Sequence, residues 1–377
     1  MISSTPDRPI SVIYKTPETE NLLKMTILLL ETVSLYNRLP EDRKALIALK
    51  PNLVVSRPAE EGATTHPEIC EGIIIYLQSH GYKNIVIVEG SWVSDSTSRA
   101  FRNCGYEKLA QKTGVKLFNT QNDDFFTVKS DEYTLKVCNI MHKIDFLINI
   151  PVLKGHCQTS YTGALKNLKG CIPDSEKRHF HSSGLHRPIA ELNTVIKQDF
   201  IVMDGICGDP TFEEGGSPST LNRILCSDDP VMLDSYAATL IGLHYSDISY
   251  ISLSAALKVG SLCEEDKNLV LEINTPVHKV ITLRDSNLEN FAARIDEQDA
   301  CSSCYTALIG ALKTAEKYEN KSGEVTFAIG RAFRGAVQSK KFIHGCIGIG
   351  NCTAGFTRSV PGCPPAAEAI RQTLSEI

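Results

Sequence analysis

The chain has 377 residues, 42 % of them hydrophobic and 22 % charged, with a formal net charge of −5. This composition is typical of a globular protein, and the length predicts two domains, or one large and one small domain. The mildly acidic balance argues against a bulk electrostatic role on nucleic acid or on an anionic membrane.

The opening segment, MISSTPDRPISVIYKTPE, has no basic stretch followed by an apolar one, so we expect no secretory signal. The longest apolar runs fall short of the ~20 residues that cross a bilayer, so we expect no membrane span. We therefore expect a cytoplasmic protein whose 13 cysteines do not form structural disulfides. Eight of them are scattered along the first 263 residues, where a cysteine is typically a small buried apolar side chain.

Short apolar runs alternate with helical patterns along the first ~270 residues. In chain order, the pattern predicts strands at 45–49, 84–90, 116–120, 145–154 and 200–209, and helices at 67–81, 96–114 and 229–243. The segment YTGA (161–164) looks helical, and SEKRHFH (175–181) is typical of a surface turn. The alternation predicts an α/β fold with a mostly parallel or mixed sheet and flanking helices.

Polar, glycine-bearing segments follow four of the predicted strands. They are KPN (50–52), EGSW (89–92), KGH (154–156) and DGICGD (204–209). In a parallel sheet the carboxyl ends of the strands share an edge, and ligands bind there. The sequence therefore predicts a site at this edge of the large domain.

The segment around KGH concentrates basic residues that could form such a site. Lys154 and His156 are two positions apart after a strand, so in extended chain their side chains share a face. The same stretch also contains Lys166, Asn167 and Lys169, and clustered cations beside strand ends could bind a carboxylate or phosphate. His156 could act as a general acid or base near neutral pH. For each lysine, the plainer interpretation is a solvated loop charge.

Other ionisable residues are further candidates. Asp204, Asp209, Asp229 and Asp234 follow later strands or begin helices, and could pair with the lysines or bind a cation; Asp229 is also an ordinary residue for a helix start. His179 and His181 form a weak candidate metal pair without a nearby acidic partner. The chain has no GxGxxG, GxxxxGK[ST] or GxSxG motif, so no nucleotide-binding or serine-hydrolase fingerprint supports those functions.

The C-terminal part of the chain is rich in cysteine. We place a domain boundary near residue 285, which gives an α/β domain at 1–285 and a small α/β, cysteine-rich domain at 286–377. The second domain contains CSSC (301–304), a predicted helix at 305–320, a predicted strand at 324–330 and a tail with Cys346, Cys352 and Cys363. Paired thiols among glycines and prolines are typical of a metal site, either an iron–sulfur cluster or a zinc site with four cysteine ligands.

Two resemblances to known families narrow these possibilities. VPGCPPAAEAI and GNCTAG resemble the segments that carry cluster cysteines in the small iron–sulfur subunits of respiratory complex I and [NiFe] hydrogenases. The chain departs from that family in its Cys-x-x-Cys pair and in the short gap between Cys352 and Cys363. The resemblance implies a [4Fe–4S] cluster on Cys301, Cys304, Cys352 and Cys363, with Cys346 as an alternative to Cys352.

The second resemblance covers almost the whole chain. KPNLV, THPE, VLKGH, GALKNLKGCIP, DGICGDP, GGSP and SDDPVMLD resemble the motifs of the uncharacterised family called domain of unknown function 362. Lys154, His156, Lys166 and Asn167 match these motifs, so the resemblance implies that they line the pocket, and they are the candidate catalytic residues. Members of that family are often linked to iron–sulfur modules, so the resemblance implies a cluster-associated protein and names no reaction.

Three functions remain open from the sequence. The first is a redox enzyme, an oxidoreductase in which a small anionic substrate binds the Lys/His site and the cluster supplies electrons. The second is an electron-transfer or sensing module that serves an electron-donor protein and has no chemistry of its own. The third is a non-redox acid–base enzyme with a structural cluster. The sequence does not determine the oligomeric state.

Overall fold

The computed structural model describes residues 10–210, 212–215, 218–263, 269–276, 294–298, 300, 302–316, 325–334 and 346–375. The chain divides into two compact units, residues 1–284 and 285–377. Among the described residues, no helix is both long and apolar enough to cross a membrane.

The first unit is built on a mixed sheet with the strand order β12-β1-β11-β10-β7-β2-β3-β4. Neighbouring strands from β10 to β4 are parallel, whereas β11 is antiparallel to both β10 and β1. The predicted α/β fold class is confirmed. The strands are β1 (Ile10–Tyr14), β2 (Ile47–Pro51), β3 (Ile85–Glu89), β4 (Lys116–Asn119), β7 (Phe146–Ile150), β10 (Phe200–Gly208), β11 (Ser219–Ser227) and β12 (Val270–Glu272).

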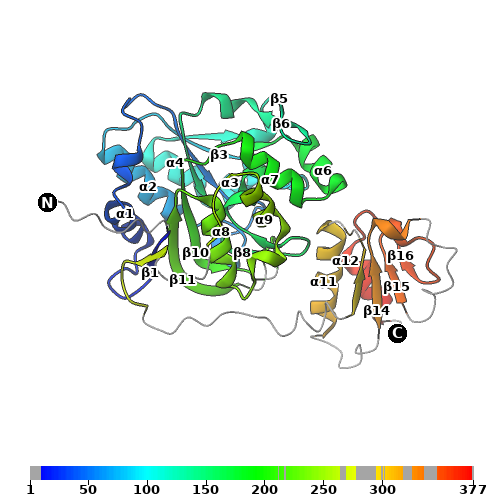
Figure 1. Ribbon diagram of the computed structural model, residues 1–377. Helices are drawn as coiled ribbons and strands as arrows, with labels where there is room; N and C mark the ends of the chain where they lie inside the picture. Colours follow the sequence, from blue (N-terminus) through cyan, green and yellow to red (C-terminus); the bar gives the residue numbers. More distant parts are fainter. Residues whose placement is uncertain are drawn as a thin grey trace. The chain divides into compact units, whose positions relative to one another are not determined.

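Helices cover both faces of this sheet (Figure 1). One face carries α1 (Leu22–Thr32), α2 (Pro67–Ser79), α3 (Thr97–Asn103) and α4 (Tyr106–Thr113). The other carries α5 (Ala164–Asn167), α6 (Asp174–Ser183), α7 (His186–Val195), α8 (Pro230–Thr239) and α9 (Ser249–Ala256). Successive residues of a strand pack into the hydrophobic cores on opposite faces of the sheet. Ile47 and Leu49 pack into the core beneath α1–α4, and Ala48 packs into the core beneath α5–α9. This alternation follows from the period of two along a strand.

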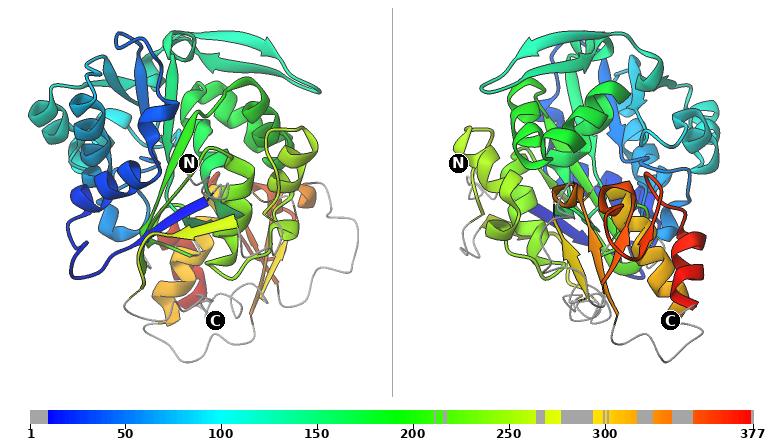
Figure 2. Two further views of the ribbon diagram at one scale, coloured as in Figure 1. Left: turned by 60° about the vertical axis from the view of Figure 1, so that its left-hand side comes forward. Right: turned by 90° about the vertical axis from the view of Figure 1, so that its right-hand side faces the viewer.

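Two small hairpins stand outside the central sheet. β5 (Phe125–Lys129) and β6 (Thr134–Cys138) pair with each other and form a two-stranded ribbon apart from the main sheet (Figure 2). β8 (Lys154–His156) pairs with β9 (Ser160–Thr162) just beyond the end of β7. The KGH segment therefore lies in a strand of its own.

Three predicted elements differ from the structure. The helix expected at 96–114 is two helices, because Gly105 adopts a φ of +83° between α3 and α4. The segment 161–164 ends strand β9 and begins α5, so Lys166 and Asn167 lie within a helix and do not follow one. The expected surface turn at 175–181 is part of helix α6.

The polar DGICGD segment, expected to come at the end of the strand at 200–209, lies almost wholly within β10. β10 continues through Gly208, with an irregular register between Gly205 and Cys207, because it pairs with the long antiparallel strand β11. The chain from Val152 to Gly155 runs beside this extension: Leu153 N donates to Asp204 O at 2.9 Å, and Gly155 N donates to Asp209 O at 2.8 Å.

Two aspartates of the SDDPVMLD segment accept hydrogen bonds from the N-terminal amides of helices α8 and α5. Asp229 caps α8 by accepting hydrogen bonds from the amides of Val231 and Met232, both at 2.9 Å. Asp234, which is fully buried, accepts from the first amides of α5, those of Ala164 at 2.7 Å and Leu165 at 3.0 Å. Burial raises the pKa of Asp234 to about 7, although these amides oppose the shift. The observed contacts of both carboxylates are structural.

The second unit contains a parallel sheet in the order β13-β14-β15-β16. Its strands are β13 (Ile295–Glu297), β14 (Thr326–Ile329), β15 (Cys346–Ile349) and β16 (Ser359–Val360). Helices α11 (Ser302–Glu316) and α12 (Ala367–Ser375) pack against each other. The helix and strand expected at 305–320 and 324–330 correspond to α11 and β14; residues 317–324 lie outside the described part of the chain.

Candidate functional site

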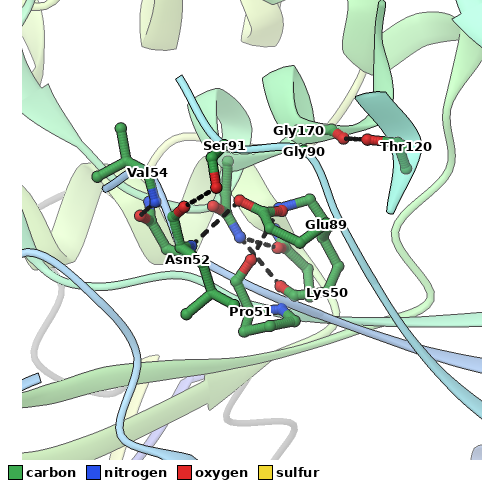
Figure 3. Close-up of polar contacts among 12 residues, drawn as sticks. Lys50, Pro51, Asn52, Val54, Glu89, Gly90, Ser91, Thr120 and Gly170 are labelled. Carbon is green, nitrogen blue, oxygen red and sulfur yellow. Dashed lines mark hydrogen bonds and ion pairs between the residues drawn. The ribbon is translucent and has the colours of Figure 1, made fainter. Parts of the chain in front are cut away.

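A buried ion pair joins the ends of β2 and β3. Lys50 of the KPN segment contacts Glu89 of the EGSW segment, and both side chains are almost fully buried (Figure 3). Lys50 Nζ also donates to the Pro51 carbonyl at 2.8 Å, and Glu89 Oε1 accepts from the Leu53 amide at 3.1 Å. Each charge thus has a second polar partner, which a buried ion needs.

The glycine of the KNLKG segment lies directly against this pair. A Cβ on Gly170 would overlap Glu89 Oε2 and would lie 2.6 Å from Lys50 Nζ. The Gly170 carbonyl accepts from Thr120 Oγ1 at 2.7 Å, which fixes the turn η5 (Leu168–Cys171) over the strand ends (Figure 3). The pair and the glycine together place the turn that carries Lys169.

A second set of contacts joins the KPN, THPE and KGH segments. Asn52 N donates to Thr65 Oγ1 at 2.8 Å, and Thr65 Oγ1 donates to the Ile150 carbonyl at 2.7 Å. Lys154 Nζ, only 1 % exposed as a residue, donates to Asn52 Oδ1 at 3.3 Å, to the Glu213 carbonyl at 2.8 Å and to the Ala63 carbonyl. Burial and the Lys166 ammonium lower the pKa of Lys154 to about 7. Lys154 is therefore a buried lysine surrounded by oxygen acceptors, and the plainer interpretation of a solvated loop charge does not hold for it.

His66 of the THPE segment pairs with Asp204 of β10. Asp204 Oδ2 accepts from both the His66 amide and His66 Nδ1, each at 2.8 Å. Burial alone would lower the pKa of His66, but the Asp204 carboxylate outweighs it and raises the pKa to about 8. The predicted meeting of these segments at the carboxyl edge is therefore explained by specific contacts.

His156 has a fixed hydrogen-bonding pattern. Its Nδ1 accepts from the amides of Gln158 at 3.0 Å and Thr159 at 3.1 Å, so the neutral ring carries its proton on Nε2. That Nε2 faces Glu213 Oε1 at 3.4 Å. Burial first, and then the Lys166 ammonium, lower the pKa of His156 well below its usual value. This environment favours a neutral hydrogen-bond donor and disfavours the general acid–base role expected from the sequence.

His156, Cys157 and Glu213 bring three potential metal-ligand atoms within 4.8 Å of one another. A metal on Nε2 would require the ring proton on Nδ1, where it would face two amide donors. Cys157 instead uses Glu213 as an acceptor, at 3.3 Å from its amide and 3.4 Å from its thiol. We interpret the trio as a hydrogen-bonded group.

Among the described residues, Lys166 and Lys169 have fewer oxygen acceptors than the other lysines of the site. They lie three residues apart on consecutive helical turns, α5 and η5, and so share a face. Neither has a carboxylate oxygen within 4.0 Å among the described residues. Lys166 Nζ lies 3.4 Å from Thr162 Oγ1, and Lys169 Nζ lies 3.2 Å from His181 Nε2. We call these two lysines the cation pair.

Half-buried side chains surround the cation pair and leave it within reach of solvent. Lys169 Nζ lies 5.8 Å from the centre of the Trp92 ring, whose edge packs against His181 with a centroid distance of 4.7 Å. Trp92, Cys157, Lys169 and His181 are all partly exposed, whereas Lys166 is 8 % exposed. Burial lowers the pKa of Lys166 to about 8.

The other predicted residues have different surroundings. Asn167 Nδ2 donates to the Lys50 carbonyl at 3.1 Å and to Asn149 Oδ1 at 2.7 Å, so its amide joins α5 to β2 and β7. His179 lies beside Ser183 and Tyr133, while His181 lies beside Lys169; the two histidines therefore do not converge as a metal pair.

Sequence reasoning missed Glu213, Cys157 and the pairing partner of Lys50. Glu213 lies 56 residues from Cys157 in the chain, in a segment with no recognised motif, and only the fold brings the two together. Cys157 is expected from the sequence to be a buried apolar side chain, but the residue is partly exposed and its thiol is hydrogen-bonded. Glu89 is a charged residue at the end of the predicted strand 84–90 and begins the EGSW segment, so the sequence did carry a signal for it.

In the second unit, three of the predicted cluster cysteines lie at one edge of the parallel sheet. Cys304 is in the first turn of α11, Cys352 is in the turn η11 (Asn351–Thr353) after β15, and Cys363 follows β16. A Cβ on Gly350, at the end of β15, would be 3.3 Å from Cys304 Sγ. Cys301, the fourth predicted ligand, lies outside the described residues.

Asn351 holds two of these cysteine loops together. The backbone amide of Asn351 donates to the Gly362 carbonyl at 2.9 Å, and the side-chain Oδ1 of Asn351 accepts from the Gly362 amide at 2.7 Å. Cys352 and Cys363 are the next residues along the two loops. Cys346 begins β15 opposite Thr326, the first residue of β14, so it lies at the other edge of the sheet, roughly 10 Å away along a four-residue strand.

The His66–Asp204 pair predicts a pH-dependent stability. The folded protein favours protonated His66, so this contribution is complete below about pH 6.5 and is lost as the pH rises through about 8. The change in pKa from 6.5 to about 8 corresponds to about 2 kcal/mol. We expect His66→Gln to remove this loss, as measured by urea unfolding of the full chain at about pH 6 and about pH 9. His244→Gln, at an exposed histidine, is the control; an unchanged pH dependence in His66→Gln would contradict the assignment.

A family model matches the part of the chain that forms this site. The family model described as a domain of unknown function (DUF362) matches residues 47–239, just over half of the chain. The thylakoid-associated protein sll1697 of Synechocystis sp. (strain ATCC 27184 / PCC 6803 / Kazusa) is 26 % identical over 238 residues, covering 60 % of this chain and 71 % of the relative.

Two solved structures share a distant likeness. The lactate racemase apoprotein from Thermoanaerobacterium thermosaccharolyticum is 11 % identical with a TM-score of 0.38, over 63 % of this chain and 58 % of that one. A structural-genomics protein from Thermotoga maritima is 14 % identical with a TM-score of 0.36, over 64 % and 59 %. The chain thus spans less than two thirds of either structure.

The family match includes the KPNLV, THPE, VLKGH, KNLKG and SDDPVMLD segments, whose contacts form the site at the strand ends, and it confirms the resemblance to the domain of unknown function 362. The cysteine-rich tail lies beyond the matched residues. The chain belongs to the family defined by the domain of unknown function DUF362.

Proposed function

We propose that the first unit is an enzyme domain that binds a small anionic substrate at the cation pair, Lys166 and Lys169. The observation that carries this proposal is the difference between the lysines of the site. Lys50 has a carboxylate and Lys154 has three oxygen acceptors, whereas in the described part of the chain Lys166 has one hydroxyl partner, Lys169 has a histidine nitrogen, and neither has a carboxylate within ion-pair distance. A carboxylate or phosphate would supply the missing charge.

The surroundings of the cation pair suit a reaction on such an anion. Trp92 offers an apolar face beside Lys169. Glu213 is a buried carboxylate that already accepts from the Cys157 amide, so it is held in one orientation. In this proposal the neutral His156 ring positions Glu213 and does not itself transfer protons.

We further propose that the second unit holds a [4Fe–4S] cluster on Cys301, Cys304, Cys352 and Cys363 and that the whole chain is a redox enzyme. A bound cluster would supply or accept single electrons. We place the protein in the cytoplasm, where its thiols stay reduced. An electron-donor protein would then be its second partner.

The described thiols of Cys304, Cys352 and Cys363 lie at one sheet edge, and one of them has a hydrogen-bond donor that suits a cluster ligand. Arg334 Nε donates to Cys352 Sγ at 3.2 Å, and such a hydrogen bond favours a negatively charged thiolate and the reduced state of a cluster.

The anion proposal predicts that Lys169→Met weakens binding of small anions. Loss of one charge-assisted hydrogen bond should lower affinity at least about tenfold. Isothermal titration of the full chain with phosphate, acetate and pyruvate measures this change. Lys197→Met is the matched control, because Lys197 is exposed and pairs with Asp199 at 2.6 Å. The proposal fails if none of the three anions binds the unmodified chain, or if both variants lose affinity equally.

The cluster proposal predicts different results for two serine variants. After anaerobic incubation with iron and sulfide, Cys352→Ser should retain less iron and lose the EPR signal of the reduced cluster. Cys346→Ser should match the unmodified chain, because Cys346 lies at the opposite edge of the sheet. Equal iron loss in both variants would contradict the ligand assignment, and uptake of zinc without a reducible cluster would exclude the redox proposal.

A further inference from the structure

The amine of Lys166 differs from the other buried amines at the strand ends. Its residue is 8 % exposed, and its Nζ has a single hydrogen bond among the described residues, at 3.4 Å to Thr162 Oγ1. Lys50 and Lys154 each donate to two or more oxygens. Lys177 donates to the carbonyls of Gly90 and Ser91 and to Asp174. Lys166 is therefore held by packing rather than by acceptors.

Burial increases the reactivity of the Lys166 amine. It lowers the pKa of Lys166 to about 8, with Glu213 and Cys157 opposing the shift. Burial and then the Lys166 ammonium also lower the pKa of Lys154 to about 7 and the pKa of Lys169 well below its usual value; a carboxylate bound to Lys169 would favour its charged form. A desolvated lysine is a recognised way to obtain a neutral, nucleophilic amine near neutral pH.

Lys169 offers a separate function at a fixed spacing from Lys166. It lies three residues along the same helical face and is half-buried beside Trp92 and His181. A ligand with a carboxylate next to an electrophilic carbon could place the first group on Lys169 and the second on Lys166. Small 2-oxo acids have this arrangement of groups.

We propose that Lys166 is a nucleophile that condenses with the carbonyl carbon of a small 2-oxo acid whose carboxylate is held by Lys169. This inference rests on the proposed function, because it assumes that the cation pair is the anion site. The Lys166 Nζ lone pair forms a C–N bond to the carbonyl carbon as the C=O π bond breaks, and a proton moves from the nitrogen to the oxygen to give a carbinolamine. The hydroxyl takes up a second proton from solvent and leaves as water while the nitrogen lone pair forms the C=N bond, so the product is a protonated imine. No oxidant or reductant is consumed.

The test traps this imine on the full chain. The protein is incubated near neutral pH with pyruvate, glyoxylate or 2-oxoglutarate and sodium cyanoborohydride, and the modified lysine is found by peptide mass spectrometry. The expected adduct adds the mass of the acid less one oxygen atom to the peptide that contains Lys166. Its yield should exceed that at the exposed Lys197 at least about tenfold, because more of the Lys166 amine is neutral.

Two variants separate the roles of the cation pair. Lys166→Arg keeps the charge and should abolish this adduct while retaining the fold, as shown by circular dichroism and thermal unfolding. Lys169→Met should lower the yield from the 2-oxo acids at least about tenfold, yet leave trapping of propionaldehyde, which has no carboxylate, unchanged.

The outcomes distinguish this inference from the function on which it rests. If none of the three acids modifies Lys166 above the level of Lys197, the imine proposal is overturned. If phosphate or pyruvate still binds and Lys169→Met still weakens that binding, the anion-site proposal stands although the imine proposal falls. If neither imine trapping nor Lys169-dependent anion binding is observed, both proposals are overturned. An equal effect of Lys169→Met on pyruvate and propionaldehyde would overturn the carboxylate role of Lys169.

Discussion

The buried contact between Lys50 and Glu89 is the constraint on which the strand-end site depends. Moving either charge out of water costs several kcal/mol, and only a close partner with further hydrogen bonds offsets that cost. The pair requires β2 and β3 to be neighbours and requires Gly170 to have no side chain. The turn that carries Lys169 is then fixed over the strand ends, so the position of a half-buried cation follows from a fully buried ion pair.

The lysines of the site differ in how many polar partners their ammonium groups have. Lys50 has a carboxylate and Lys154 has three oxygen acceptors, whereas the cation pair has no carboxylate within 4.0 Å in the part of the chain that the structure describes. Lys166 is nevertheless only 8 % exposed, so hydration compensates little of its charge. Such an arrangement is typical of a site that is completed by a ligand, and perturbed ionisation often accompanies function.

In the second unit, strand direction determines where the cysteines lie. Parallel strands bring the segments after β15 and β16 to the same edge, and the reciprocal hydrogen bonds of Asn351 and Gly362 align the two loops that carry Cys352 and Cys363. Strand direction therefore separates Cys346 from the other described cysteines of the tail, a question that spacing along the chain left open.

The sequence predicted the α/β fold and the edge of the sheet at which polar segments meet, because runs of Val and Ile and the residues after them are local signals. It did not predict that Asn167 and Asp234 make structural contacts, since their partners are groups of distant segments. The tautomer of His156 likewise depends on two amides whose positions follow from the β8–β9 hairpin. Residue type and spacing indicate which groups are present, whereas the fold determines which of them are already satisfied.

The most direct test of this account is an anaerobic crystal structure of the full chain soaked in bromide, with the ion located by anomalous scattering. The account predicts a bromide within contact of Lys166 Nζ and Lys169 Nζ, with Lys50 still paired to Glu89. The account would be contradicted if no anion occupied this position and both amines of the cation pair were bound to carboxylates of the protein.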